Sequence, residues 1–149
     1  MTSKSLINLA TNKERKRFVS QKNLLIEIVN TYRRFDWRLR RLLLRPEILN
    51  ELAQAGFDLE RELALPNDLI EAGEVDAAWF ARPTQAGGEA WELRLIAAER
   101  FALFETFELD EAEEEREDVR REMQARLRDR TLKIRNDDFE LNDELALDE

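Results

Sequence analysis

The chain contains no cysteine and no histidine. Without cysteine it has no disulfide, no thiolate nucleophile and no zinc site with sulfur ligands. Without histidine it lacks the commonest general base and the commonest metal ligand. Glycine is also scarce, with four residues in all, so no glycine-rich phosphate loop is expected. We therefore expect a protein that is not an enzyme and that binds neither a cofactor nor a metal ion.

Carboxylates are the one catalytic group in plentiful supply, with 33 Asp and Glu residues. Glu113, Glu114, Glu117 and Asp118 lie close together in the sequence and could chelate a hard cation. Glutamate-rich exposed helices are, however, far more often simply solvated. A carboxylate-based enzyme is therefore the second alternative function and not the favoured one.

Long hydrophobic runs are missing as well. No stretch approaches the roughly 20 apolar residues of a membrane span, and the N-terminus lacks the apolar region of a signal peptide. The chain of 149 residues has the usual size of one domain, and its 38% of charged residues exceeds the usual share of about a quarter. We expect a cytoplasmic protein with no membrane association, either a monomer or a homodimer.

Charge is distributed unevenly along the chain, although the total is −9. Residues 1–45 contain 12 Lys and Arg against 3 Asp and Glu, whereas the remainder contains 12 against 30. The balance is thus +9 in the first part and −18 in the second. Such asymmetry indicates a basic face for a nucleic acid, an acidic face for a basic partner, or two parts that neutralise each other in the fold.

An alternating pattern of apolar and polar residues predicts three antiparallel strands, at residues 75–82, 90–98 and 101–109. Pro83 ends the first strand, and the adjacent Gly87 and Gly88 permit a hairpin turn. We choose the register that gathers the large apolar side chains on one face of the sheet. These side chains are Trp79, Trp91, Leu93, Leu95, Leu103 and Phe107. The opposite face keeps a smaller apolar row that needs a cover or a partner, consisting of Phe80, Ile96 and Phe104.

Residues 36–45 read DWRLRRLLLR and predict a fourth strand, which joins the other three. Leu39 and Leu43 then lie on one side of the strand, and Arg38 and Arg40 lie on the other. Arg45 precedes a proline, which favours extended geometry. A helix is the alternative, because leucine and arginine are good helix formers.

Three helices are expected beside this sheet, at residues 20–34, 46–55 and 110–131. The first has an apolar stripe at helical spacing, the second opens with a proline, and the third has acidic residues early and basic residues late. The fold class is therefore α+β, a four-stranded, mostly antiparallel sheet with helices packed mainly on one face. Residues 13–135 form this single domain, between a flexible N-terminus at 1–12 and an acidic, flexible tail at 136–149.

These features favour a protein-interaction module, such as an adaptor, an assembly factor or an immunity-type inhibitor, that binds a protein partner through acidic and apolar surface. The candidate contact residues are Phe80, Ile96, Phe104, Phe139, Leu141, Leu145 and Leu147.

Nucleic-acid binding is the first alternative function. Its candidate residues lie beside aromatic side chains and could contact phosphates; they are Arg33, Arg34, Arg38, Arg40 and Arg41. The sequence pI of about 4.8 counts against it, because nucleic-acid-binding domains are usually basic. We therefore expect no salt-sensitive binding to DNA or RNA.

Overall fold

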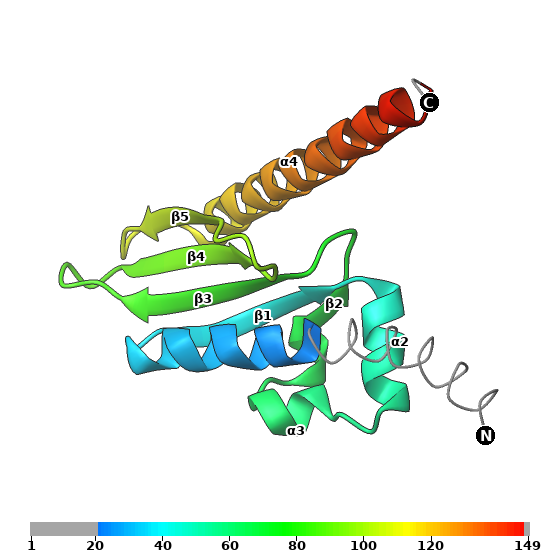
Figure 1. Ribbon diagram of the computed structural model, residues 1–149. Coiled ribbons are helices and arrows are strands. Elements are labelled where there is room, and N and C mark those ends of the chain that lie inside the picture. Colours follow the sequence, from blue (N-terminus) through cyan, green and yellow to red (C-terminus); the bar gives the residue numbers. More distant parts are fainter. Residues whose placement is uncertain (1–20, 148–149) are drawn as a thin grey trace.

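The computed structural model describes the backbone of residues 21–147 and the side chains of residues 21–134. Five strands form one mixed sheet in the order β2-β1-β3-β4-β5, and helices lie against it (Figure 1). The strands are β1 Arg38–Leu44, β2 Ile70–Ala72, β3 Ala77–Pro83, β4 Glu89–Leu95 and β5 Ala102–Phe107. β2 runs parallel to β1, and the other neighbouring strands are antiparallel.

The predicted α+β class and the predicted meander, β3-β4-β5, are confirmed. The expected number of four strands is one too few. The additional strand, β2, has only three residues and follows directly on a short 3₁₀ turn at Asn67–Leu69. So short a strand leaves no alternation in the sequence, because a period of two needs at least four residues to be recognised.

The helices of the described residues are a first helix that covers residues 21–34, α2 Pro46–Gln54, α3 Leu59–Leu63 and α4 Glu113–Leu147. We call the first of these the N-terminal helix. α3 was not predicted, because five residues span little more than one turn. α4 is longer than the predicted 110–131 and remains helical to Leu147, where a flexible tail was expected. No glycine or proline follows Gly88, so the sequence contains no residue that stops a helix strongly.

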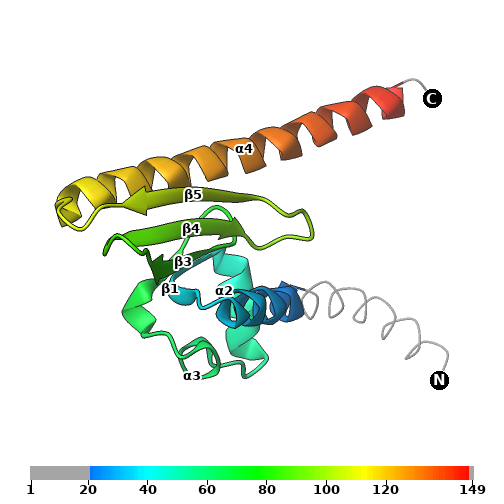
Figure 2. The same cartoon turned by 90° about the vertical axis from the view of Figure 1, so that its left-hand side faces the viewer.

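The sheet lies between α4 on one side and the other helices on the opposite side (Figure 2), and each face carries its own apolar cluster. On one face, which we call the three-helix face, Leu25 and Val29 of the N-terminal helix pack with Leu42 and Phe80 of the sheet. The other face, the α4 face, is covered by α4, whose Met123 and Leu127 belong to the second cluster. The expectation that helices lie mainly on one face thus holds for three of them, and α4 is the exception.

The predicted register of the meander is confirmed. Its large apolar side chains share the α4 face, where most are buried and Leu103 is partly buried. Pairs of strand neighbours agree with this register, since Trp79 lies opposite Leu93 and Leu93 lies opposite Leu103. A single face therefore holds both tryptophans of the meander and the buried Phe107.

The predicted strand at 36–45 is confirmed as β1, but its side chains do not alternate as expected. The register against β3 shifts between Leu39 and Arg41, as in a β-bulge. Because of this extra residue, Arg40 and Arg41 both reach the ring of Trp91 on the α4 face, at 5.2 and 5.8 Å from its centroid. Leu42 consequently lies on the three-helix face with Leu39. No glycine or proline lies within β1, so nothing in its sequence marks the bulge.

Arginine side chains attach α4 to the sheet. Buried Arg120 lies 3.9 Å from the ring centroid of Trp91, and its Nη1 donates to Glu113 at 2.7 Å and to Glu117 at 2.9 Å. Arg41 of β1 donates through both terminal nitrogens to the same Glu117, each at 2.7 Å. Hydrogen bonds from Arg41, and then from Arg120, lower the pKa of the Glu117 carboxyl to about 2.

A second ion pair, between Asp76 and Arg45, connects the ends of neighbouring elements. Asp76 is buried just before β3, and its carboxylate accepts hydrogen bonds from the backbone and the guanidinium of Arg45 and from Gln21. Arg45 stands between β1 and α2, while Gln21 belongs to the N-terminal helix. These pairs, like Arg41 with Glu117, join the basic first part of the chain to the acidic second part, so part of the charge asymmetry is neutralised within the fold.

Candidate functional site

The three residues of the predicted apolar row, Phe80, Ile96 and Phe104, differ in their exposure. Phe80 and Ile96 are 0% and 3% exposed and lie in the core under the N-terminal helix. Phe104, on the edge strand β5, is 56% exposed. Of the row, only Phe104 therefore offers a large surface to a partner. The remaining predicted contact residues have side chains outside the described part of α4: Phe139, Leu141, Leu145 and Leu147.

The five predicted nucleic-acid arginines do not form one patch. Arg41 faces α4 and is paired with Glu117. Arg33, Arg38 and Arg40 line a common hollow beside the start of β1. Arg34 is exposed at the end of the N-terminal helix and is not among the residues that line this hollow.

A tight turn brings the N-terminal helix and β1 together at this hollow. The amide of Trp37 donates to the carbonyl of Tyr32 at 3.1 Å, and the amide of Asp36 donates to the carbonyl of Arg33 at 3.1 Å. This is the Schellman arrangement, and Asp36 takes the required left-handed conformation with φ 66°. Aspartate tolerates that conformation better than most residues. The turn reverses the chain within three residues, so Trp37 packs edge-on against Tyr32.

Aromatic and arginine side chains continue from this turn across the sheet. Trp37 meets Phe104 of β5 edge-on, with 6.5 Å between ring centroids. The guanidinium of Arg82, at the end of β3, lies 4.4 Å from the centroid of Trp37. Phe35 lies next to them in the turn and is 65% exposed, and its carbonyl accepts a hydrogen bond from Arg82. We call this set the aromatic–arginine surface: Phe35, Trp37, Arg82, Pro83 and Phe104.

Two hollows flank Arg82 on this surface. The first, which we call the arginine hollow, has a volume of about 560 Å³ and contains four arginines in its lining: Arg33, Arg38, Arg40 and Arg82. The second, the proline hollow, has a volume of about 520 Å³ and lies between Pro83 and Phe104. Asp36, Arg82 and Pro83 line both hollows, so the two are neighbours.

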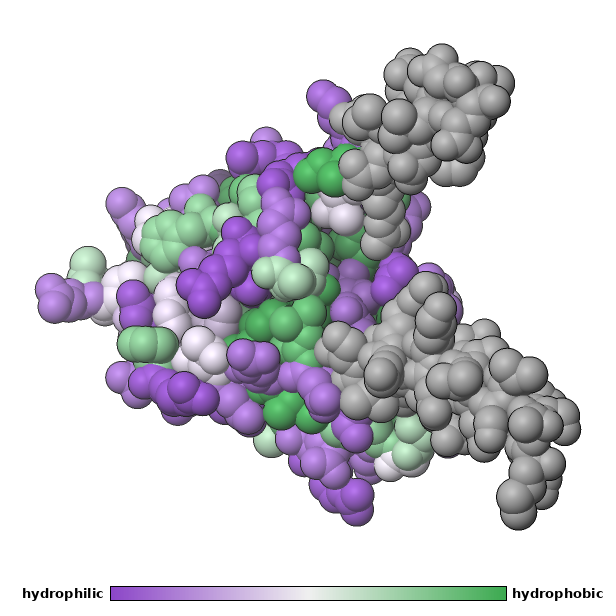
Figure 3. Space-filling model, in the orientation of Figure 1, coloured by the Kyte–Doolittle hydropathy of each residue, from purple (hydrophilic) through white to green (hydrophobic). Residues whose placement is uncertain are grey.

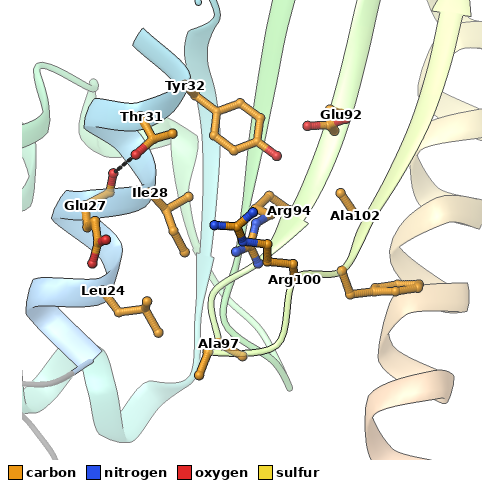
Figure 4. Close-up of a pocket in the computed structure, with 12 residues that line it drawn as sticks. Leu24, Glu27, Ile28, Thr31, Tyr32, Glu92, Arg94, Ala97, Arg100 and Ala102 are labelled. Atoms are coloured by element: carbon orange, nitrogen blue, oxygen red, sulfur yellow. Dashed lines mark hydrogen bonds between the residues drawn. The ribbon is translucent and has the colours of Figure 1, made fainter. Parts of the chain in front are cut away.

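A third hollow lies between the N-terminal helix and strands β4 and β5, with a volume of about 520 Å³ (Figure 4). Tyr32 and Glu92 line it from opposite elements, and Arg100 projects from the loop that joins the two strands. Burial, and then a hydrogen bond with Glu92, raise the pKa of the Tyr32 hydroxyl. The hydroxyl is therefore protonated at neutral pH and is unsuited to act as a base.

On the side of the molecule seen in Figure 3, separate apolar patches lie among charged side chains. Within residues 21–134, no group of three or more acidic side chains is arranged to hold a metal ion. None of the described helices has the length and apolarity that crossing a membrane requires.

Compared with known proteins, the chain matches no family model, no curated protein and no solved structure.

Arg82 and Pro83 are the members of the surface that sequence reasoning missed. Arg82 reaches Trp37 from β3, more than forty residues further along the chain, through the pairing of Arg38 with Ala81. The predicted strands contained a signal for this contact, because an antiparallel pairing of 36–45 with 75–82 places the end of one beside the start of the other. The order of strands in the sheet was the missing information.

Proposed function

We propose that this chain is a non-enzymatic protein-interaction module that binds a segment of a protein partner on its aromatic–arginine surface. The observation that carries the proposal is the grouping of exposed apolar side chains. In the described part of the chain, four large apolar side chains are exposed: Phe35, Phe104, Leu109 and Ile134. Two of them, Phe35 and Phe104, flank Trp37 and Arg82.

The composition of this surface supports a protein partner. Tryptophan and arginine are enriched among the residues that dominate protein–protein binding energy, and phenylalanine is enriched at interfaces generally. The Trp37 ring is held by contacts with Tyr32, Phe104 and Arg82. Side chains held in place before binding lose less conformational entropy when a partner arrives.

The arginines indicate the charge of the partner segment. Arg82 separates the two hollows, and three further arginines line the first of them. A segment with an acidic residue next to an apolar one complements this surface, because the acid faces Arg82 and the apolar side chain faces Phe104. This revises the sequence-based expectation, in which the protein's own acidic and apolar surface made the contact.

Single-stranded nucleic acid is the second candidate, because Arg33, Arg38 and Arg40 share a hollow beside exposed aromatic side chains that could stack on bases. The net charge of −9 disfavours it, since binding to a polyanion depends on several phosphate contacts together with an attractive overall field. The protein partner is thus the better-supported reading.

Selection of peptides from a random display library tests the proposal. We expect the selected peptides to combine acidic and apolar residues, and we expect Phe104→Ser to weaken their binding about tenfold or more, as for a central contact residue. Leu109→Ser is the matched control, because Leu109 is 74% exposed but lies outside the aromatic–arginine surface. Fluorescence anisotropy of the labelled peptides measures both variants.

Two results would contradict the proposal. One is a selection that yields no binding peptide, or peptides that Phe104→Ser and Leu109→Ser weaken equally. The other is tight binding of a labelled single-stranded oligonucleotide that falls steeply with salt and is lost on changing Arg38 and Arg40 to Glu, which would establish the nucleic-acid reading.

A further inference from the structure

We propose that the partner segment binds as an added strand along the free edge of β5, where backbone hydrogen bonds hold it beside Phe104. This inference rests on the proposed protein-binding function and states the conformation in which the segment is bound. The free edge is the side of β5 that faces away from β4. None of the described strands lies on that side, because β5 ends the order β2-β1-β3-β4-β5.

The register of β4 and β5 determines which backbone groups point to the free edge. The amide of Leu95 donates to the carbonyl of Phe101 at 3.0 Å, so this pair is hydrogen-bonded across the two strands. Bonded pairs recur at every second residue of an antiparallel ladder. The odd-numbered residues of β5 therefore bond to β4, and the even-numbered residues direct their amides and carbonyls to the free edge. These are Ala102, Phe104 and Thr106.

The backbone groups on the free edge are available to a new partner. Within the described part of the chain, no turn or loop bonds to the amides or carbonyls of these three residues. The amide of Thr106 donates to the side chain of the neighbouring Glu105 at 3.1 Å, and this contact is exposed. An extended segment carries alternating donors and acceptors along its backbone, which is the pattern that such an edge requires.

The edge also lacks most of the features that prevent pairing. Edge strands are commonly protected by short length, proline or several charged residues. β5 has six residues and no proline, and Glu105 is its one charged residue. Phe104 is 56% exposed and Thr106 is exposed as well. The edge is therefore open from the three-helix face.

The position of α4 favours a single strand over a second copy of the chain. α4 packs on the opposite face of the sheet, and in both views it extends past β5 on the side away from β4 (Figures 1 and 2). Antiparallel pairing of β5 with its own copy would create a two-fold axis beside β5, with both α4 helices on the same face. The two helices would meet at that axis, whereas a single segment brings no helix.

Phe104 indicates the side chain that the segment places next to it. Phe104 lies opposite Glu92, which lies opposite the buried Phe80 of the three-helix face, so all three side chains share that face. Directly opposed side chains of neighbouring strands contact each other, and aromatic residues pair well with aromatic or β-branched ones. We expect an apolar residue of the segment, either aromatic or β-branched, opposite Phe104.

Amide hydrogen exchange of the wild-type protein tests the free edge directly. Without a ligand, the amides of Ala102 and Phe104 should exchange quickly, while those of Leu103 and Glu105 are protected by β4. A peptide from the display selection, at about ten times its Kd, should slow exchange at Ala102 and Phe104 about tenfold, because their amides bond only in the complex.

N-methylation of the peptide tests the same contact from the other side. Alternate amides of an added strand face β5, so methylating every second residue should weaken binding about tenfold or more. Methylating the intervening residues should change binding less than about twofold. Ala102→Pro should also weaken binding, because it removes one outward amide that the ladder does not use. Ala102→Val keeps the amide and is the matched control.

The outcomes separate this inference from the proposed function. If peptides bind without slowing exchange at Ala102 and Phe104, or if N-methylation shows no period of two residues, strand addition is wrong and the protein-binding function stands. If no peptide binds, both proposals fail. If analytical ultracentrifugation shows a dimer that protects the same two amides without a peptide, the edge binds a second copy and the inference is wrong.

Discussion

A buried arginine carries much of the attachment of α4. Arg120 is enclosed between the helix and the sheet, where it contacts the ring of Trp91 and two glutamates. Taking a charge out of water is costly, and it becomes favourable only when partners surround it. Truncating this side chain removes one of the two arginines that contact Glu117, removes the contact with Glu113, and opens a gap in the packing.

We therefore expect Arg120→Ala to lower the free energy of unfolding by about 3 kcal/mol. The adjacent Arg121→Ala is the matched control, because Arg121 is exposed and its only described ion pair, with Asp118, is exposed as well. That change should cost less than about 0.5 kcal/mol. Urea denaturation followed by circular dichroism measures both, and equal losses for the two variants would show that Arg120 is not a central contact.

The stability that Glu117 contributes to the attachment of α4 depends on pH. Its pKa is lowered from 4.5 to about 2 in the folded protein, so the folded state favours the ionised carboxylate. Its contribution to stability is complete above pH 4.5 and is lost as the pH falls through that value towards 2. We expect Glu117→Gln to destabilise the protein near neutral pH, with a difference from the wild type that shrinks progressively in acid.

Urea denaturation of both proteins across this range measures the difference. Glu114→Gln, on an exposed position of the same helix, provides the comparison. A stability difference for Glu117→Gln that stays constant down to low pH would mean that the lowered pKa is not the cause.

At the scale of elements, the close approach of β4 and β5 depends on one glycine. A Cβ atom added to Gly88 would lie 2.1 Å from the carbonyl oxygen of Phe107, which no packed structure accommodates without moving a strand. The same addition at Gly73 meets nothing nearer than 3.5 Å, which is an ordinary contact.

Gly88→Ala should therefore reduce the free energy of unfolding by about 2 kcal/mol or more, as overpacking does elsewhere. Gly73→Ala should be nearly neutral. Thermal and urea denaturation of the two variants provide the comparison, and a neutral Gly88→Ala would indicate that β5 moves aside at little cost.

Elements whose apolar residues recur at a regular spacing were predictable from the sequence, and elements without such a spacing were not. The meander and its register follow from alternation in sequence, and the N-terminal helix follows from its apolar stripe. The bulge between Leu39 and Arg41 could not be predicted, because it arises from pairing with β3 and not from a local signal. The same pairing brings Arg82 to Trp37, so the candidate site was predictable only in its local part, the arginines and aromatic residues around the turn.

For the molecule as a whole, the two apolar layers share their central strands. Successive residues of β3 alternate between them: Ala78 and Phe80 belong to the three-helix face, and Ala77 and Trp79 belong to the α4 face. β1 likewise contributes Leu42 to the first and Leu43 to the second. Neither layer can lose its strands without exposing the other, so we expect a single cooperative unfolding transition.

Tryptophan fluorescence can test this because the three tryptophans report on different faces. Trp37 packs against the three-helix cluster, whereas Trp79 and Trp91 lie in the α4 cluster. In a Trp37→Phe variant the fluorescence reports on the α4 face, and in a variant with both Trp79→Phe and Trp91→Phe it reports on the opposite face. Within each variant, the urea midpoints from fluorescence and from far-ultraviolet circular dichroism should coincide, because the shared strands couple the layers. A fluorescence transition of the α4-face reporter at clearly lower urea would show instead that α4 detaches while the rest of the sheet stays folded.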